Sequence, residues 1–348
     1  MAYTTIDKPS DYFETKLYTG TGSEQSITGL DFAPNWVWVK CRSDAENHVL
    51  HDTVRGATKV LHSDTTDGEY TVAQGLKSFN SDGFTLGTSN FMNQSSRTFA
   101  SWNWKAGTSF TNDASSTGIG SIDSAGSVNT DAGFAIITYT GTGSAATVAH
   151  GLGVAPKMII NRTISAAKNW ITYHASLGAT KFVELDTTDA AATSSDKFNN
   201  TEPTSTVFSI ESSSQNNTSG GTCLAYCFAE KQGYSKFFSY EGNSNVNGSY
   251  IHLGFSAAFI MVKPIDAADN WVMFDNKRLG FNSSTSPYNF YANKNFAETT
   301  DTGQIDILSN GFKIRNSGGT VNKSSTYIGM AFAASPFVTS SGIPATAR

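Results

Sequence analysis

Residues 18–23 read Tyr-Thr-Gly-Thr-Gly-Ser, and the same six residues recur at positions 139–144. A related stretch, Tyr-Glu-Gly-Asn-Ser-Asn, occupies positions 240–245. The three tyrosines are separated by roughly 120 and roughly 100 residues, and self-similarity at such a spacing is the sequence signature of a repeat architecture. This motif decides how the 348-residue chain is organised.

The residues downstream of each motif keep nearly the same offsets. An apolar run that ends in a cation comes first: Trp-Val-Trp-Val-Lys at 36–40, Met-Ile-Ile-Asn-Arg at 158–162 and Phe-Ile-Met-Val-Lys at 259–263. Further positions match copy by copy, namely Leu30, Leu152 and Leu253; Phe32, Val154 and Phe255; Asn47, Asn169 and Asn270; Phe84, Phe208 and Phe312; and Trp104, Phe228 and Phe332. We therefore predict three tandem copies of one unit of about a hundred residues.

The pattern within each copy is typical of strands. Short apolar runs rich in Val, Ile, Phe, Tyr and Trp alternate with clusters of Gly, Ser, Asn and Asp. No stretch has a helical period long enough to cross a sheet, which argues against βαβ units and a parallel sheet. The run at 134–139 is apolar on nearly every side, as expected of a strand that is buried on both faces or lies at a domain contact. We predict an all-β fold of three tandem antiparallel β-sandwich repeats of a jelly-roll or lectin-like kind.

Composition shifts set the predicted boundaries. They give an N-terminal arm (1–16), repeat 1 (17–106), a Gly/Ser-rich linker (107–130), repeat 2 (131–234), repeat 3 (235–337) and a C-terminal tail (338–348). The segment 107–130 has hardly any large apolar residue, which favours a flexible linker, but Ile119, Ile122 and Val128 leave an edge strand open. Repeat 2 runs into repeat 3 without a polar spacer, so these two should pack rigidly together.

Charge and cysteine content exclude several classes of partner. Only 15% of the residues are charged and the net charge is -5, without a Lys/Arg block, so a nucleic acid is not an expected partner. The N-terminus lacks the features of a signal peptide and no long apolar run occurs, so we expect synthesis in a reducing cytoplasm and no membrane insertion. The cysteines, Cys41, Cys223 and Cys227, are expected to be buried small hydrophobic residues rather than disulfide or metal ligands.

Four sets of residues are candidates for a functional site. Asp52, His174 and Asp275 occupy matching positions, but an active site shared by every copy should not switch between Asp and His, so we interpret them as turn or strand-end polar groups. A zinc site could be considered for His48, His51 and His62 with Asp52. These residues have neither two histidines four positions apart on a helix nor cysteine partners, which are the patterns that make a zinc site specific. The carboxylates Glu184, Asp186 and Asp189 lie in a polar turn and define no glycosidase pair.

The fourth set is aromatic. Trp36 and Trp38 lie on one face of one strand, and their counterparts in the other copies are apolar, so core packing is favoured over an exposed sugar-stacking platform. We therefore assign no catalytic, cofactor-binding or metal-binding residue, expect no cofactor, and predict that the chain is not an enzyme. The loops that make functional contacts are left unassigned.

Four longer segments resemble a known repeat family. They are GYSKFFSYEGN at 233–243, SNGFKIRNSGG at 309–319, YIGMAFAASPF at 327–337 and HGLGVAPKMII at 150–160. They are similar to a repeat of structural and tail-fibre-like proteins of tailed phages, many of them marine, over about residues 12–337. Two departures are visible: Phe238 stands where similar sequences often have glycine, and the first copy has His48 where the others have Trp170 and Trp271.

The resemblance implies a virion component without catalytic residues to carry over. It is expected on the virion surface, made in the host cytoplasm, as a tail-fibre or tail-associated adhesin that binds a host surface polysaccharide or receptor through several weak contacts. The alternatives are a capsid decoration or head-fibre protein that stabilises the shell, and a carbohydrate-binding module outside any virion. Expected partners are other tail or capsid proteins, a host cell-surface glycan, and further copies of the chain in a homo-oligomer such as a trimer. The arm 1–16, with Tyr12 and Phe13, and the tail 338–348 are candidate attachment segments.

Overall fold

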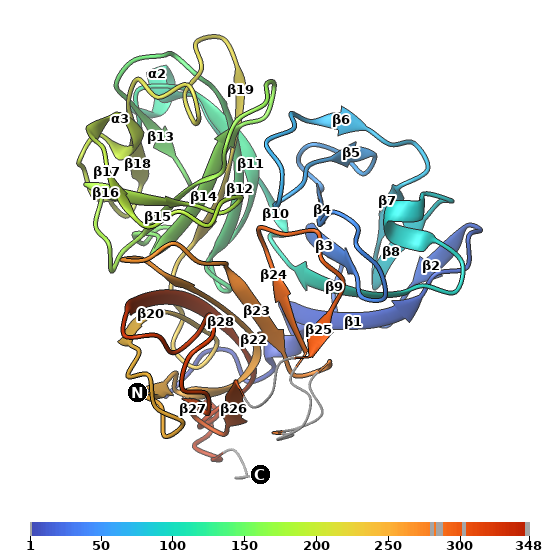
Figure 1. The fold of residues 1–348 in the computed structure, drawn as a ribbon. Helices are drawn as coiled ribbons and strands as arrows, with labels where there is room; N and C mark the ends of the chain where they lie inside the picture. The colour runs from blue at the N-terminus through green and yellow to red at the C-terminus, as the bar shows by residue number, and fades with distance from the viewer. Residues whose placement is uncertain (1, 279–281, 283–287, 301–303, 345–348) are drawn as a thin grey trace.

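The computed structural model describes residues 2–278, 282, 288–300 and 304–344, and its ribbon is shown in Figure 1. The described chain is all-β, and every pairing between its named strands is antiparallel. The strands fall into three groups, which we call unit 1 (13–104), unit 2 (108–228) and unit 3 (235–336). The predicted all-β, antiparallel class is therefore confirmed.

Unit 1 follows a short 3-10 helix at Pro9–Asp11. Its strands are β1 (Phe13–Thr19), β2 (Gln25–Ile27), β3 (Trp36–Cys41), β4 (Val49–Asp52), β5 (Lys59–Val60), β6 (Tyr70–Thr71), β7 (Leu76–Asn80), β8 (Gly83–Leu86) and β9 (Thr98–Trp104), with a helical turn α1 (Asn90–Asn93). The larger sheet has the order β1-β9-β3-β4 and the smaller one β2-β8-β7, while β5 pairs with β6.

Unit 2 begins with a hairpin that the other units lack. Its elements are β10 (Thr108–Asn112), α2 (Ala114–Thr117), β11 (Ser124–Asn129), β12 (Phe134–Thr140), β13 (Ala146–Ala149), β14 (Met158–Thr163), β15 (Ile171–His174), β16 (Lys181–Glu184), β17 (Ala192–Thr193), α3 (Ser195–Phe198), β18 (Val207–Ile210) and β19 (Thr222–Phe228). The larger sheet has the order β10-β11-β12-β19-β14-β15-β16-β17, and β13 pairs with β18.

Unit 3 repeats the same plan. Its strands are β20 (Ser235–Glu241), β21 (Tyr250–His252), β22 (Phe255–Pro264), β23 (Val272–Asp275), β24 (Tyr288–Tyr291), β25 (Thr299–Thr300), β26 (Ile305–Leu308), β27 (Gly311–Ile314) and β28 (Thr326–Pro336). The larger sheet has the order β20-β28-β22-β23-β24-β25 and the smaller one β21-β27-β26. The orders β1-β9-β3-β4, β12-β19-β14-β15 and β20-β28-β22-β23 are equivalent, so one strand order occurs three times.

Two predicted boundaries change. The segment 107–130, for which a flexible linker was favoured, contains β10 and β11, and β11 pairs with β12 over its whole length. The edge-strand alternative is therefore correct, and the linker prediction is wrong. The small residues allow β11 to pair closely with β12, because a Cβ on Gly126 would lie 1.8 Å from the carbonyl oxygen of Ile136. The N-terminal arm is also shorter than predicted, since β1 begins at Phe13 rather than at residue 17.

Alternation along the central strands divides the apolar side chains between two kinds of core. In β3, Val37 and Val39 point into a cluster within unit 1, where they meet Phe84 and Leu86 of the smaller sheet. Units 2 and 3 have equivalent clusters of their own. The opposite face of β3 carries Trp36, which belongs to a fourth cluster.

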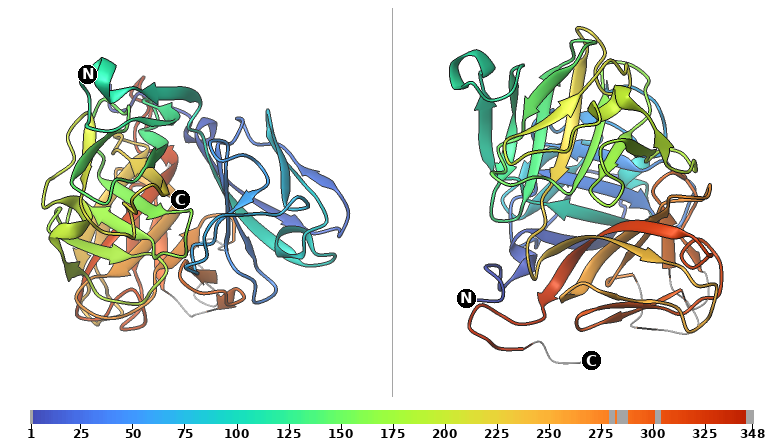
Figure 2. Two further views of the ribbon diagram at one scale, coloured as in Figure 1. Left: turned by 90° about the horizontal axis from the view of Figure 1, so that it is seen from above. Right: turned by 90° about the vertical axis from the view of Figure 1, so that its left-hand side faces the viewer.

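This fourth cluster joins all three units, and we call it the central core. Its largest members are aromatic, and they include Phe13, Trp36, Trp38, Trp102 and Trp104 of unit 1, Phe134, Tyr226 and Phe228 of unit 2, and Phe237, Phe259 and Phe332 of unit 3. Ring contacts cross every boundary, such as Trp36 with Tyr226 at 4.3 Å, Trp104 with Phe259 at 5.8 Å and Phe228 with Phe332 at 6.0 Å between centroids. Figures 1 and 2 show the three units grouped around this common centre.

Several predictions about burial are met. Trp36 and Trp38 are buried core residues, and the run 134–139 divides its side chains between the central core and the unit 2 cluster. The three cysteines are buried and free. One matched position differs, because Val154 is 44% exposed while Phe32 and Phe255 are buried.

The N-terminal arm packs on unit 3, and the C-terminal tail is bonded to the arm. In the N-terminal arm, the hydroxyl of Thr4 donates to the carbonyl of Gln232 at 2.8 Å, and that of Tyr3 donates to the carbonyl of Gly254 at 2.9 Å. Phe337, the residue before the C-terminal tail, donates its N–H to the same Gly254 carbonyl. Within the tail, Ser340 N–H donates to Asp7 of the arm. Their described parts are therefore held against the body and against each other.

Candidate functional site: the seams between the units

The repeated Tyr-x-Gly motif is held by side-chain hydrogen bonds inside each unit. We call this set of bonds, made by the motif tyrosine and a buried asparagine, the clamp. The hydroxyl of Tyr139 donates to the carbonyl of Asn216 at 2.6 Å, and the side chain of the next residue, Asn217, bonds both ends of the turn that follows the motif. Its Oδ1 accepts from Thr142 N–H at 2.7 Å, and its Nδ2 donates to the carbonyls of Ser144 and Glu211. Asn217 is fully buried, so these bonds replace its contacts with water.

Units 1 and 3 repeat the clamp at the matching positions. Asn93 accepts from Thr21 N–H, and Tyr18 donates to the carbonyl of Met92. Asn322 accepts from Asn243 N–H, and the matching tyrosine of unit 3 donates to the carbonyl of Val321. The glycine of the motif permits the close approach, because a Cβ on Gly20, Gly141 or Gly242 would lie 2.0–2.3 Å from a carbonyl oxygen. The motif is thus structural, and sequence reasoning missed its asparagine partner.

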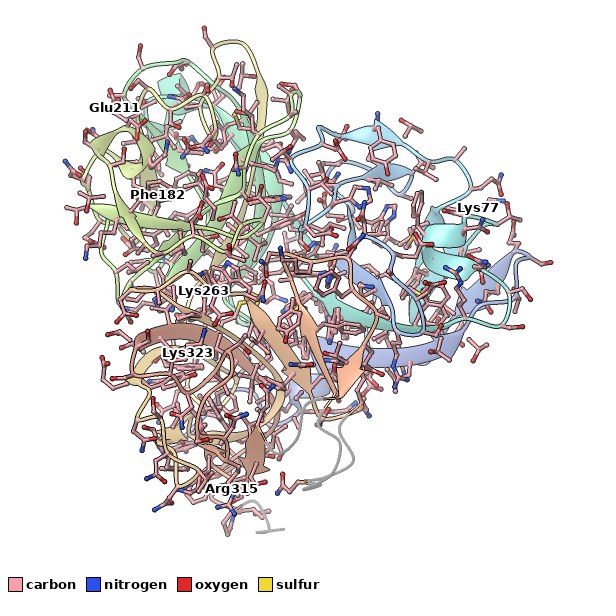
Figure 3. All side chains as sticks on the ribbon, in the orientation of Figure 1. Lys77, Phe182, Glu211, Lys263, Arg315 and Lys323 are labelled. Carbon is pink, nitrogen blue, oxygen red and sulfur yellow. The ribbon has the colours of Figure 1, made fainter. Side chains whose placement is uncertain are left out.

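The cation that ends each apolar run reaches toward another unit. The three cations are Lys40, Arg162 and Lys263, and each is fully buried. Arg162 of unit 2 donates to the carbonyls of residues 65–67 in unit 1, at 2.7–3.3 Å. Lys263 of unit 3 donates to the carbonyl of Thr188 in unit 2 at 3.1 Å, and Figure 3 shows it at that boundary. The Lys40 ammonium of unit 1 lies 5.3 Å from the ring centroid of Phe290 in unit 3.

We call each boundary between two units a seam. At every seam, a ring nitrogen of one unit makes a hydrogen bond to a backbone carbonyl of the neighbouring unit. Trp170 Nε1 of unit 2 donates to the carbonyl of His62 in unit 1 at 2.7 Å, and Trp271 Nε1 of unit 3 donates to that of Glu184 in unit 2 at 2.8 Å. In unit 1, His48 takes the place of the tryptophan, and its Nε2 lies 3.0 Å from the carbonyl of Tyr291 in unit 3.

His48 donates the same hydrogen bond as the tryptophans of the other units because its neighbours fix the tautomer of its ring. Its Nδ1 accepts a hydrogen bond from Trp38 Nε1 at 2.8 Å, so the proton of the neutral ring lies on Nε2 and is donated across the seam. Burial holds the pKa of His48 well below its usual range and keeps the ring neutral. The departure seen in the first copy is therefore a substitution that preserves one hydrogen bond.

Each of these donors is itself positioned by a side chain. Asp64 accepts from His48 N–H at 3.1 Å, Asp186 from Trp170 N–H at 2.9 Å, and Asn293 from Trp271 N–H at 3.0 Å. Burial raises the pKa of the Asp64 and Asp186 carboxyls to about 7, and it lowers the pKa of the Lys40 and Lys263 ammonium groups to about 8. The seams therefore contain groups whose charge costs stability near neutral pH.

The opposite side of each unit carries the matched set Asp52, His174 and Asp275. Each ends a strand, as predicted, and each bonds to the following unit around the ring. Tyr226 of unit 2 donates to Asp52 at 2.8 Å, and Trp102 of unit 1 donates to Asp275 at 3.1 Å. His174 of unit 2 lies 3.2 Å from the carbonyl of Gly329 in unit 3.

Two of the seams also contain buried ion pairs. Asp275 pairs with Arg278, which also binds Glu298, and Glu298 makes a bidentate pair with Arg42 of unit 1. In unit 1, Asp52 pairs with Arg55, which also reaches Glu69. The backbone N–H of Glu69 donates to the carbonyl of Ile164 in unit 2. His174 replaces the aspartate in unit 2, and burial lowers its pKa to about 4, so this position is neutral.

The remaining candidates are not brought together as reactive sets. His48 and His62 use their ring nitrogens in hydrogen bonds to carbonyl, hydroxyl or indole groups. Glu184 binds Asn169 and Gln215, while Asp186 faces Trp170. Among the residues that the structure describes, no group of three or more His, Cys, Asp or Glu side chains is placed to hold a metal ion.

The surface offers few aromatic side chains for stacking. All six tryptophans are buried. Tyr70 and Phe91 of unit 1 are each 37% exposed, and both rings contact His62. Tyr250 of unit 3 is 44% exposed beside His252. Charged residues such as Lys77, Glu211 and Arg315 lie on the outer rim, as labelled in Figure 3.

None of the helices within the described ranges is long and apolar enough to cross a membrane. A comparison with curated proteins found no match. A family model described as a domain of unknown function, DUF7483, matches residues 8–336, which is nearly the whole chain and includes all three units. The chain therefore belongs to the DUF7483 family.

Proposed function

We propose that this chain is a non-enzymatic structural protein on the surface of a tailed-phage particle, built from three tandem antiparallel β-sandwich copies of a jelly-roll or lectin-like kind. The observation that carries the proposal is the ring of seams: equivalent contacts run from unit 2 to unit 1, from unit 3 to unit 2 and from unit 1 to unit 3. Such a ring gives one chain an approximate threefold symmetry. The resemblance of the repeats to phage structural proteins is the reason for proposing that the protein belongs to a phage particle.

Decoration of the capsid is the role that this geometry supports best. A body of three units that repeat one strand order can make three related contacts where three shell subunits meet, and linked weak contacts strengthen one another. A protein that binds the assembled shell but not the separate subunits stabilises the shell by mass action. The polar groups of the seams are used in holding the units together, which favours a scaffold over a catalyst. The proposed partners are therefore other virion proteins.

The second candidate is the tail-associated adhesin that binds a host glycan. The observation in its favour is the exposed pair Tyr70 and Phe91, because aromatic rings at a surface can stack on sugars. Trp36 and Trp38 offer no such surface, since both side chains lie in the central core, as predicted. A glycan-binding module outside a virion would use the same pair of rings.

Co-sedimentation separates these roles. Purified protein is mixed with empty capsids of the parent phage and, separately, with host cells, and the bound fraction is measured in each pellet. Decoration predicts saturable binding to capsids, unchanged in a Tyr70→Ser/Phe91→Ser variant. Binding to cells alone, lost in that variant and after removal of surface polysaccharide, would refute decoration and establish the adhesin.

A further inference from the structure

The smaller sheet of unit 3 has an outer face unlike those of units 1 and 2. In that sheet β21 and β26 both pair with β27, so Tyr250, Lys313 and Asp306 form one row across it. Side chains alternate along a strand, and the neighbouring row, which includes Ile251 and Phe312, belongs to the core of unit 3. The row that contains Tyr250 therefore points away from the core.

The same row in the other units is made of small hydroxyl side chains. In unit 1, Ser26 lies opposite Thr85, and in unit 2, Thr147 lies opposite Ser209. The match is set by the adjacent core pair in each sheet, which contains the equivalent residues Phe84, Phe208 and Phe312. Among these three rows, only that of unit 3 carries an aromatic ring and a cation.

Two rings stand side by side on this face. Tyr250 is 44% exposed and His252 is also exposed, with 6.4 Å between the ring centroids. The Tyr250 hydroxyl lies 3.3 Å from both His252 Nδ1 and the carbonyl of Asn310, so the tyrosine ring is held in one orientation. An exposed aromatic ring in a fixed orientation offers an apolar face on which a sugar ring can stack.

Cations lie beside the rings. Lys313 faces Tyr250 across the sheet, and its Nζ donates to the carbonyl of Gly248 at 2.9 Å. Arg315 pairs through Nε with Asp306 of the same row at 3.2 Å, and its side chain remains 48% exposed. Figure 3 shows Arg315 at the outer rim of unit 3. This face therefore carries two cations against one carboxylate, in the unit in which Lys and Arg outnumber Asp and Glu.

A loop rich in amide side chains borders the rings and the cations. It covers residues 242–249, between β20 and β21, and contains the exposed residues Asn243, Asn245 and Asn247. The bond from Lys313 to the carbonyl of Gly248 joins this loop to the sheet. The Nδ2 groups of Asn245 and Asn247 donate to none of the described residues, so they are available to a ligand. Side-chain amides both donate and accept hydrogen bonds, as recognition of sugar hydroxyls requires.

We propose that this face of unit 3, which we call the outer patch (Tyr250, His252, Lys313 and Arg315), binds an acidic polysaccharide. The two rings stack on sugar faces, the two cations bind carboxylate groups, and the loop amides bind hydroxyl groups. The rings and amides favour an acidic saccharide over an acidic protein surface, because charge alone would not use them. This inference goes beyond the proposed function, since it requires neither a capsid nor a virion.

The probe is a fluorescently labelled oligogalacturonate, whose sugars carry carboxylates, and its binding to the full chain is measured by fluorescence polarisation. Tyr250→Ser/Lys313→Thr gives unit 3 the serine and threonine of the matching row in unit 1, so this variant should fold. Tyr70→Ser/Phe91→Ser, which removes the exposed rings of unit 1, is the matched control. We expect binding to the native and control chains, and a loss of at least about tenfold in the unit 3 variant.

Arg315→Gln, at an exposed position, provides a second variant if the double variant does not fold. It should weaken binding several-fold, and added salt should weaken binding to the native chain more than to this variant. A neutral malto-oligosaccharide should bind at least about tenfold more weakly than the oligogalacturonate.

Four results would overturn the proposal. No binding at millimolar oligogalacturonate would remove the ligand, and unchanged binding in both unit 3 variants would remove the site. Loss of binding in the unit 1 control would place the saccharide on Tyr70 and Phe91 instead. Polyglutamate that binds as tightly as the oligogalacturonate would establish an acidic protein as the partner.

Discussion

Replacing Asp186 with asparagine should stabilise the folded chain at and above neutral pH and have little effect in acid. Asp186 accepts a hydrogen bond from Trp170 N–H at the seam between units 1 and 2, and burial raises the pKa of its carboxyl to about 7 from an ordinary value of 3.8. Asparagine keeps the accepting oxygen and cannot ionise. The structure already contains this arrangement, because Asn293 occupies the matching place in unit 3.

The sign follows from proton linkage. In the unfolded chain the carboxyl ionises near pH 3.8, but in the folded chain it holds its proton to about pH 7. Folding therefore binds a proton between these values, and stability falls as the pH rises through this window. The rise of the Asp186 pKa from 3.8 to about 7 corresponds to about 4 kcal/mol, and the half-buried position of the carboxyl reduces this to about 1–2 kcal/mol.

The amide of the new side chain also has an available partner. Asn293 Nδ2 donates to Asn270 Oδ1 at 2.9 Å in unit 3, and Asn169 stands at the place of Asn270 in unit 2. The assay is urea unfolding of the native and Asp186→Asn chains from pH 4 to pH 8.5. We expect a gain of about 1–2 kcal/mol above pH 7 that disappears near pH 4. A gain that is independent of pH, or a loss of stability at pH 8, would refute the reasoning.

Three further predictions concern the seams and the clamp. Burial lowers the pKa of Lys40 and Lys263 to about 8, so the free energy of unfolding should rise as the pH increases from about 8 to 10.5. Lys263→Met should remove part of this rise in urea denaturation curves, and an unchanged pH dependence in the variant would contradict the prediction. Asn217→Ala should cost about 2–4 kcal/mol in urea unfolding, because it leaves buried backbone groups without partners, and a loss below about 0.5 kcal/mol would rule out the clamp. Gly141→Ala should lower the melting temperature strongly, since its Cβ would lie 2.3 Å from the Thr218 carbonyl, while Gly318→Ala, with open space around it, should change it little; similar shifts for both would count against the close-approach argument.

Local patterns predicted the strands and their buried faces. The offsets after the tyrosine motifs located equivalent strands, and alternation placed Trp36 and Trp38 in a core. These properties depend on neighbouring residues, which the sequence displays directly. The strand-end positions of Asp52, His174 and Asp275 were predicted for the same reason.

The closed ring was not predicted, because it depends on contacts between residues far apart in the chain. The sequence shows the apolar runs that end in Lys40, Arg162 and Lys263, but it does not show the residues of other units that these cations contact. One signal was present: Asp-Thr-Thr-Asp occurs at both 64–67 and 186–189, and both segments accept from the cation of the next unit. The linker prediction for 107–130 is wrong because small residues, which are typical of linkers, here permit close strand pairing.

The most direct test of the proposed role is a cryo-electron microscopy reconstruction of parent capsids saturated with the purified protein. Decoration by a pseudo-threefold body predicts one three-lobed density above each position where three shell subunits meet, with the lobes related by an approximate threefold rotation. Bare shells under saturating conditions, or density confined to the tail, would contradict the account.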